Sequence, residues 1–363
     1  MKILFAGVID KPSQTGWQRM RALQRLGHEV APVSLTPTHR ENSWNSLQKR
    51  VLRAARYETT LHKKAAQCSS EVLRTALEHN PDLIWLEWPR LITAETITEI
   101  KRRLPAARIA SFQHDNPFAD RTYAAYGWKR FFEAIPYYDV HLVKRPADIA
   151  EYHSRGANKV ELFTDGYCED LFYPETPKPD GGDFQVIFVG TSLDYRVAVL
   201  DRLTRRYKLD IHIFGERWNR TKLYWTRRRL LHPAAEGDVY RHVVCGSKIA
   251  LGFVSHSNRD DWTIRTFEVP ACGAFFLAER TQSHQQFYEE GKEAEFFASP
   301  EECRDKILYY LDHDSARERI AAAGRHRCLR SGYGLRSRMQ QALDLIYPSS
   351  VTYHHVHAVG ISR

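Results

Sequence analysis

Two apolar runs, each ended by a glycine and followed by a helical segment, constrain the fold of this chain most. The first run spans residues 2–8, and the helical segment after it has apolar residues at positions 17, 20, 23 and 26. The second run extends from Phe184 to Gly190 and leads into a helix expected over 195–207. Strand, glycine-bearing loop and helix open a doubly wound α/β domain, so two such domains are predicted.

The boundaries of these domains follow from a segment rich in proline and glycine. Residues 173–183, YPETPKPDGGD, contain three prolines and two glycines and are the best candidate for a linker. We therefore expect an N-terminal domain over 1–172, a C-terminal domain over 184–347 and a tail over 348–363. A chain of 363 residues suits two domains of this size.

The composition indicates a globular protein and bears on its cellular location. Hydrophobic residues make up 43% and charged residues 27%, as in soluble globular proteins, and no apolar run approaches the ~20 residues of a membrane span. The first ten residues resemble a strand more than a signal peptide. Six scattered cysteines without a Cys-x-x-Cys pair make structural disulfides unexpected and favour a cytoplasmic location. Three histidines in the tail, at 354, 355 and 357, form only a weak metal candidate.

A formal net charge of +9 favours an anionic partner, which could be a nucleotide, an anionic membrane surface or a nucleic acid. Charge alone does not choose among them. The basic segment 42–79 permits contact with a membrane or an acceptor, although a solvated helix face is the simpler interpretation.

Polar loops are expected where open α/β sheets place their ligands, beyond the carboxyl ends of strands. Gly7 and Gly16 are too far apart for a dinucleotide-binding fingerprint. His114 and Asp115 follow the strand expected at 108–112, where they could contact a sugar, steer a phosphate or serve as a base. An Asx-turn closed by Pro117, with His114 merely packed, is the alternative.

The second half offers two similar loops. Gly190 and Thr191 precede a helix N-terminus with Arg196 in its first turn, which is a suitable site for an anion. Gly215 and Trp218 follow the strand expected at 209–214. Trp218 could stack on a nucleotide base or belong to the core.

Residues 258–279 combine a short helix, a glycine stop at Gly273 and a buried strand. Within them Arg265 lies three residues before Glu268. A carboxylate can accept hydrogen bonds from two vicinal hydroxyls while a guanidinium forks onto phosphate oxygens, so the pair suits a molecule carrying both groups. An ordinary i,i+3 ion pair on a helix surface is the competing interpretation.

Several segments together resemble the GT-B glycosyltransferases and, within them, the spore-maturation CgeB-like group. The resemblance is strongest from about 160 to 330. It rests on these stretches: His114-Asp115-Asn116-Pro117, Gly166-Tyr167 with Leu171-Phe172-Tyr173-Pro174, Phe188-Val189-Gly190 with Arg196, Gly215-Glu216-Arg217-Trp218, Ser247-Lys248, and Arg265-Thr266-Phe267-Glu268 through Gly273.

This resemblance implies two Rossmann-like domains facing across a cleft, with a nucleotide-sugar donor held by the second domain and an acceptor by the first. Glu268 would bind the donor ribose, and the neighbouring Thr266 belongs to the same donor motif. Asp260 would touch the transferred sugar, although Asp261 competes for that role. His114 or Asp115 would face the sugar or acceptor.

The diphosphate would be neutralised by Arg265, Lys248 and the Gly190–Thr191 loop, without a metal or other cofactor. The absence of an Asp-x-Asp motif in a ligand-binding loop agrees with that expectation. The donor sugar, its base, the acceptor, the oligomeric state and the choice between inversion and retention stay open.

Two other functions stay open as well. The basic stretches at 49–64 and 222–229 would suit a nucleic-acid-binding protein or a DNA-modifying transferase, although no nucleic-acid module is present. A protein that binds sugar nucleotides without catalysing transfer is the second alternative.

Overall fold

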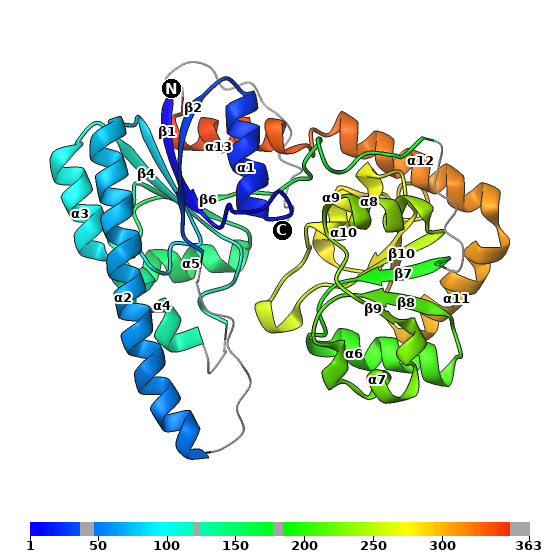
Figure 1. The fold of residues 1–363 in the computed structure, drawn as a ribbon. Coiled ribbons are helices and arrows are strands. Elements are labelled where there is room, and N and C mark those ends of the chain that lie inside the picture. Colours follow the sequence, from blue (N-terminus) through cyan, green and yellow to red (C-terminus); the bar gives the residue numbers. More distant parts are fainter. Residues whose placement is uncertain (37–46, 120–123, 177–183, 349–363) are drawn as a thin grey trace.

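The computed structural model describes residues 1–36, 47–119, 124–176 and 184–348, with the side chains of 47–61 and 124–127 left out. Two α/β domains lie side by side, each built on one six-stranded sheet (Figure 1). Every strand pair in both sheets is parallel, which confirms the predicted pair of doubly wound domains. The histidines at 354, 355 and 357 and most of the expected linker lie outside the described residues.

The N-terminal sheet has the strand order β2-β1-β3-β4-β5-β6. Its central strands are buried along almost their whole length because helices cover both faces of a parallel sheet. In β3, for example, all five residues are buried. The elements are β1 (Lys2–Gly7), α1 (Thr15–Arg25), β2 (Glu29–Ser34), α2 (Leu47–His79), β3 (Leu83–Glu87), α3 (Ala94–Arg103), β4 (Arg108–Gln113), α4 (Ala124–Ala134), β5 (Val140–Val143), α5 (Pro146–Ser154) and β6 (Val160–Leu162).

The C-terminal sheet has the order β12-β11-β10-β7-β8-β9. Two of its helices, α10 and α11, begin at a side chain that caps the first turn. The Ser299 side chain, for instance, accepts from the Glu302 amide at 3.1 Å. The elements are β7 (Val186–Val189), α6 (Asp194–Asp201), β8 (Ile211–Phe214), α7 (Lys222–Thr226), β9 (Leu231–His232), α8 (Gly237–Gly246), β10 (Ile249–Gly252), α9 (Arg265–Ala271), β11 (Phe276–Glu279), α10 (Gln282–Phe287), β12 (Glu295–Phe297), α11 (Pro300–Asp312) and α12 (Asp314–Arg330).

The last helix, α13 (Leu335–Ile346), returns to the N-terminal domain and packs on α1 (Figure 1). Arg108 donates to the Ile346 carbonyl, and the Tyr347 hydroxyl donates to the Asp82 carbonyl at 2.7 Å. We expected this segment to close the C-terminal domain. The difference arises because the apolar face of α13 is buried against the N-terminal domain. The spacing of apolar residues predicts that the helix has such a face, but not which domain the face packs against.

The loops after β4 and β5 meet the loop of residues 253–264, which follows β10. The backbone amide of Asn116 donates to the Asn258 side chain at 2.8 Å, and Lys144 reaches Asp260. The carboxyl ends of the two sheets therefore lie toward each other. This is the edge at which α/β sheets place their ligands.

Candidate functional site

Helix α9 places Arg265 and Glu268 at the carboxyl end of β10. The Arg265 Nη1 atom lies 3.6 Å from Glu268 Oε2. Glu268 is only 4% exposed, whereas a third of the Arg265 side chain is open. Burial raises the pKa of Glu268, and Arg265 and the Tyr240 hydroxyl oppose that rise. The pair is therefore not the solvated surface ion pair that we considered as an alternative.

The Gly190 loop is held in place by close backbone packing. The Trp218 Nε1 atom donates to the Gly190 carbonyl at 2.8 Å. A Cβ atom added to Gly215 would lie 2.1 Å from the same carbonyl oxygen, so position 215 accepts only glycine without a shift. Trp218 itself is 3% exposed and packs in the core. It supports the loop but has no open face on which a base could stack.

Arg196, in the first turn of α6, is buried beside this loop. Its Nη2 atom donates to the Val254 carbonyl at 3.0 Å, while its Nε atom has no hydrogen-bond partner among the described residues. Burial lowers the pKa of Arg196. Both Arg265 and Glu279 act on it electrostatically, so Arg196 lies in the same polar region as the α9 pair.

Three other predicted residues take different positions. Lys248 precedes β10 and therefore lies at the opposite end of the sheet, where its Nζ atom is 3.2 Å from Asp314. Thr266 is fully buried, and its hydroxyl contacts His284 Nε2 at 2.9 Å. Thr191 is half-buried in the Gly190 loop. Arg196 therefore lies near Arg265 of the α9 pair, whereas Lys248 lies at the other end of the sheet.

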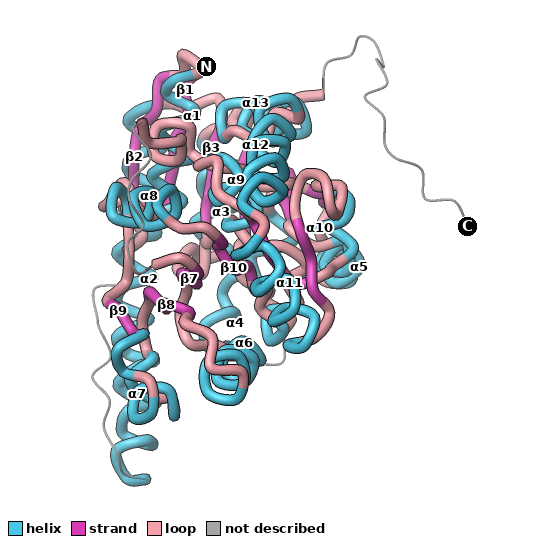
Figure 2. Tube along the Cα trace, turned by 90° about the vertical axis from the view of Figure 1, so that its right-hand side faces the viewer, coloured by secondary structure: helices cyan, strands magenta, loops and turns pink. Residues whose placement is uncertain are grey.

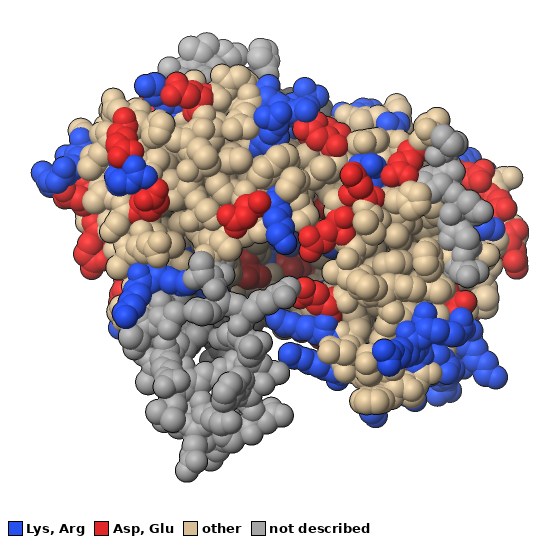
Figure 3. Space-filling view, in the orientation of Figure 1, with Lys and Arg blue, Asp and Glu red and all other residues tan. Residues whose placement is uncertain are grey.

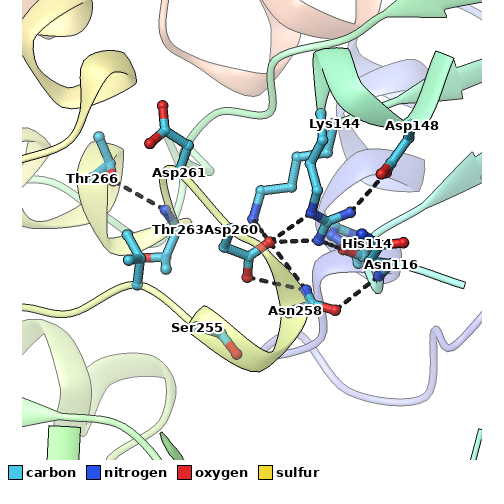
Figure 4. Close-up of polar contacts among 12 residues, drawn as sticks. His114, Asn116, Lys144, Asp148, Ser255, Asn258, Asp260, Asp261, Thr263 and Thr266 are labelled. Carbon is cyan, nitrogen blue, oxygen red and sulfur yellow. Dashed lines mark hydrogen bonds and ion pairs between the residues drawn. The ribbon is translucent and has the colours of Figure 1, made fainter. Parts of the chain in front are cut away.

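Asp260 connects the two domains (Figure 4). Its Oδ1 atom accepts from Lys144 Nζ at 3.0 Å and from Arg145, both of which directly follow β5. The Asn258 amide donates to both carboxylate oxygens at 3.0 Å. Burial lowers the pKa of Lys144, and the charge of Asp260 opposes this shift.

The neighbouring Asp261 carboxylate points away from this cluster in Figure 4 and accepts from the Ser283 amide at 2.7 Å. It fixes the start of α10. Of the two candidate acids, only Asp260 faces the N-terminal domain.

His114 lies at the carboxyl end of β4 next to a buried ionic cluster. Arg19, fully buried, donates to both oxygens of Asp165 at 2.8 Å and to both oxygens of Glu87 at 2.9 and 3.1 Å. His114 Nε2 contacts Arg19 and is 3.5 Å from Glu87 Oε1. Burial alone would raise the pKa of Glu87, but Arg19 and His114 lower it to about 2.

The His114 side chain is 31% exposed, so its ring is accessible on one side. Asp115 is half-buried beside it. The Asx-turn that we considered does form, but at Asn116, whose side chain accepts from the Phe118 amide at 2.9 Å.

Sequence reasoning missed the residues that support the site in the N-terminal domain. Lys144 and Arg145 had a usable signal, because they directly follow an apolar strand at its carboxyl end. Arg19 and Asp165 had none. Their contacts join residues 146 positions apart in the sequence.

The charged groups of this region come mostly as pairs of opposite sign. Figure 3 shows acidic and basic side chains set deep where the surface is hollowed between the domains. Within the described part of the chain, no three metal-ligating side chains are grouped. No helix among the described residues is long and apolar enough to cross a membrane.

Two parallel six-stranded sheets, with their carboxyl ends facing and the final helix returned to the first domain, define a GT-B fold. The family model described as glycosyl transferase-like matches residues 196–344. No curated protein gives a significant match to the sequence.

Solved structures share the fold over almost the whole chain. Sucrose-phosphate synthase of Thermosynechococcus elongatus has a TM-score of 0.63 at 12% identity, covering 95% of this chain and 98% of its own. HepE of Anabaena in complex with UDP-glucose has a TM-score of 0.63 at 12% identity, covering 96% and 100%.

A putative UDP-N-acetylglucosamine 2-epimerase of Listeria monocytogenes also has this fold, with a TM-score of 0.53 at 12% identity and coverage of 96% and 97%. The fold by itself therefore does not distinguish sugar transfer from epimerisation.

Proposed function

We propose that this protein is a glycosyltransferase of the CgeB-like group that takes its nucleotide-sugar donor in the C-terminal domain. The observation that carries the proposal is the buried Glu268 beside the half-open Arg265, at the start of a helix on the carboxyl edge of the second sheet. The family model that covers this region supports it. So does the fold shared with a protein solved in complex with UDP-glucose.

The donor would be held by groups of matching chemistry. The two Glu268 oxygens accept hydrogen bonds from the ribose hydroxyls, which compensates the carboxylate for its burial. Arg265 turns its exposed guanidinium to the diphosphate. In the Gly190 loop, the amides of Gly190 and Ser192 already donate to backbone carbonyls, so we assign the further donor to the Thr191 amide. Arg196 adds a buried positive charge behind that loop.

Departure of a nucleoside diphosphate needs about two negative charges stabilised in the transition state. We infer that Arg265, Arg196 and the Thr191 amide supply this stabilisation, so the reaction runs without a metal. These groups are fixed by the fold before the donor binds, and they need no reorganisation as charge develops.

On the acceptor side, His114 is the better candidate for a base. Its ring is 31% exposed and is oriented by Glu87 and Arg19. Asp260 is engaged by Lys144, Arg145 and Asn258, so its carboxylate is already neutralised. In this arrangement Asp260 joins the domains, and we assign the proton transfer to His114, with Asp115 as the second candidate.

Nucleotide binding tests the donor site. Isothermal titration of the wild type with UDP, dTDP and GDP is compared with Glu268→Gln, which keeps the shape and removes the charge. Loss of a charge-assisted hydrogen-bonding group is expected to weaken binding by about 10- to 100-fold. Glu99→Gln, on the surface of α3, is the control and should bind as the wild type does. Absence of binding for all three nucleotides would refute the proposal.

Product analysis separates the remaining alternatives. A transferase consumes its donor with release of a nucleoside diphosphate, and His114→Ala should slow that release. Conversion of the donor to an isomeric sugar nucleotide would indicate an epimerase instead. Binding without either change would indicate a protein that only holds sugar nucleotides.

A further inference from the structure

One segment of the C-terminal domain is strongly basic. Residues 202–232 contain ten lysines and arginines and two acidic residues, a net of +8 in a chain whose total is +9. In Figure 3 the basic side chains gather at the lower right, over α6 and α7. The basic side chains of α7 and of the turn after it lie away from α9 in Figure 1, and the proposed donor site does not use them.

Trp225, on α7, projects from the middle of this segment. Its side chain is 82% exposed, the highest value among the large hydrophobic side chains of the described residues. Its ring meets that of Tyr224 edge to face at 5.2 Å, and the Arg228 guanidinium lies 5.0 Å from the Tyr224 ring. The Tyr224 ring packs against the edge of the Trp225 indole, and the faces of the indole stay open to solvent.

A shallow cavity of about 380 Å³ lies next to this tryptophan. Its lining combines the indole with basic side chains and a few polar or apolar groups: Lys208, Trp225, Arg227, Arg228, Arg229 and Thr204 among them. Arg229 is paired with Asp210 and Arg227 donates to the Thr204 carbonyl. Lys208 and Arg228 form no ion pair with any described residue, so their charges remain available.

We propose that this surface docks the protein on a bilayer of anionic phospholipids, with Trp225 at the interface and headgroup phosphates beside Lys208 and Arg228. An amphipathic indole prefers the level of the headgroups, and each basic side chain near an anionic surface adds attraction. Tryptophan at the centre of a basic patch combines both contributions.

The shape of the surface favours a bilayer over a nucleic acid. Single-stranded nucleic acids are bound along a basic groove with several aromatic platforms. Here one tryptophan stands on an outward-facing tip and the cavity beside it is short. Both Figure 1 and Figure 2 place α7 and the beginning of α2 on the same side of the molecule, so a flat surface can approach both domains together.

Vesicle sedimentation with the full chain tests the proposal. Phosphatidylcholine vesicles with and without phosphatidylglycerol are compared at low and high salt, without nucleotide. We expect binding only to the anionic vesicles, decreasing with salt. Lys208→Ala combined with Arg228→Ala should lower the partition coefficient about thirtyfold and flatten its salt dependence. Trp225→Ala should lower it at both salt concentrations without changing the slope.

Arg102→Ala combined with Arg103→Ala, on the exposed face of α3, removes the same charge elsewhere and should leave binding unchanged. The proposal is overturned by equal binding to both kinds of vesicle, by wild-type binding of the two patch variants, or by an oligonucleotide that binds this patch and displaces the vesicles. None of these readouts depends on a sugar-nucleotide donor, so failure here and failure of the proposed transferase activity are distinguishable.

Discussion

Removal of the Asp260 carboxylate should uncouple the two domains. Lys144 Nζ lies 3.0 Å from Asp260 Oδ1, and Arg145 contacts the same oxygen. At an effective dielectric constant of about 20, one such pair is worth about 5 kcal/mol of Coulomb energy. Part of this is offset because Asp260 itself no longer has to be desolvated, so Asp260→Ala should cost about 3–5 kcal/mol of unfolding free energy.

Urea unfolding followed by circular dichroism measures this loss, and a double-mutant cycle assigns it. With Lys144→Met in the same chain, one uncompensated buried cation is removed, so the double variant should be more stable than the sum of the single losses predicts. Asp201→Ala, which breaks an exposed pair with Arg205, should leave the midpoint unchanged. Equal stability of Asp260→Ala and the wild type, or strict additivity in the cycle, would contradict the coupling described here.

Three further results are expected. The pKa of Glu87 is held at about 2, below its ordinary value of 4.5. About 3 kcal/mol of unfolding free energy that is present above pH 5 should therefore disappear as the pH falls toward 2. Urea unfolding midpoints measured across this pH range should show this loss in the wild type but not in Glu87→Gln. Gly215→Ala should displace the Gly190 carbonyl, lowering stability by about 1–3 kcal/mol and weakening nucleotide binding, and a variant that binds as the wild type does would contradict this packing. Truncation before residue 335 should uncover the apolar side of α1 and increase binding of a hydrophobic dye, whereas an unchanged dye signal would show that α13 is dispensable.

The alternation of apolar strands and helices was sufficient to predict both domains because a parallel sheet needs strands that are buried on both faces. The residues at strand ends were harder. The pairing of Arg265 with Glu268 could be predicted because the two residues are three positions apart on one helix, and their role in donor binding stays a prediction. Lys248 was misplaced relative to the donor region because it begins a strand, whereas ligands bind where parallel strands end.

Contacts between residues far apart in the sequence could not be predicted from local spacing. Arg19 gave no sign of being buried, since its partners Glu87 and Asp165 come from distant strand ends. The neutralisation of Asp260 likewise requires Lys144 from the other domain. Spacing along a chain says which side chains share a local face, but not which distant charge will compensate a buried one.

The return of α13 to the first domain also determines the order in which the protein can be completed during synthesis. The ribosome releases the N-terminal strands first, yet α13, which packs on α1, comes from residues 335–346 near the end of the chain. The C-terminal domain must therefore emerge, and can fold, before its predecessor is finished. Until translation nears its end, the nascent first domain presents an uncovered apolar surface that chaperones can recognise.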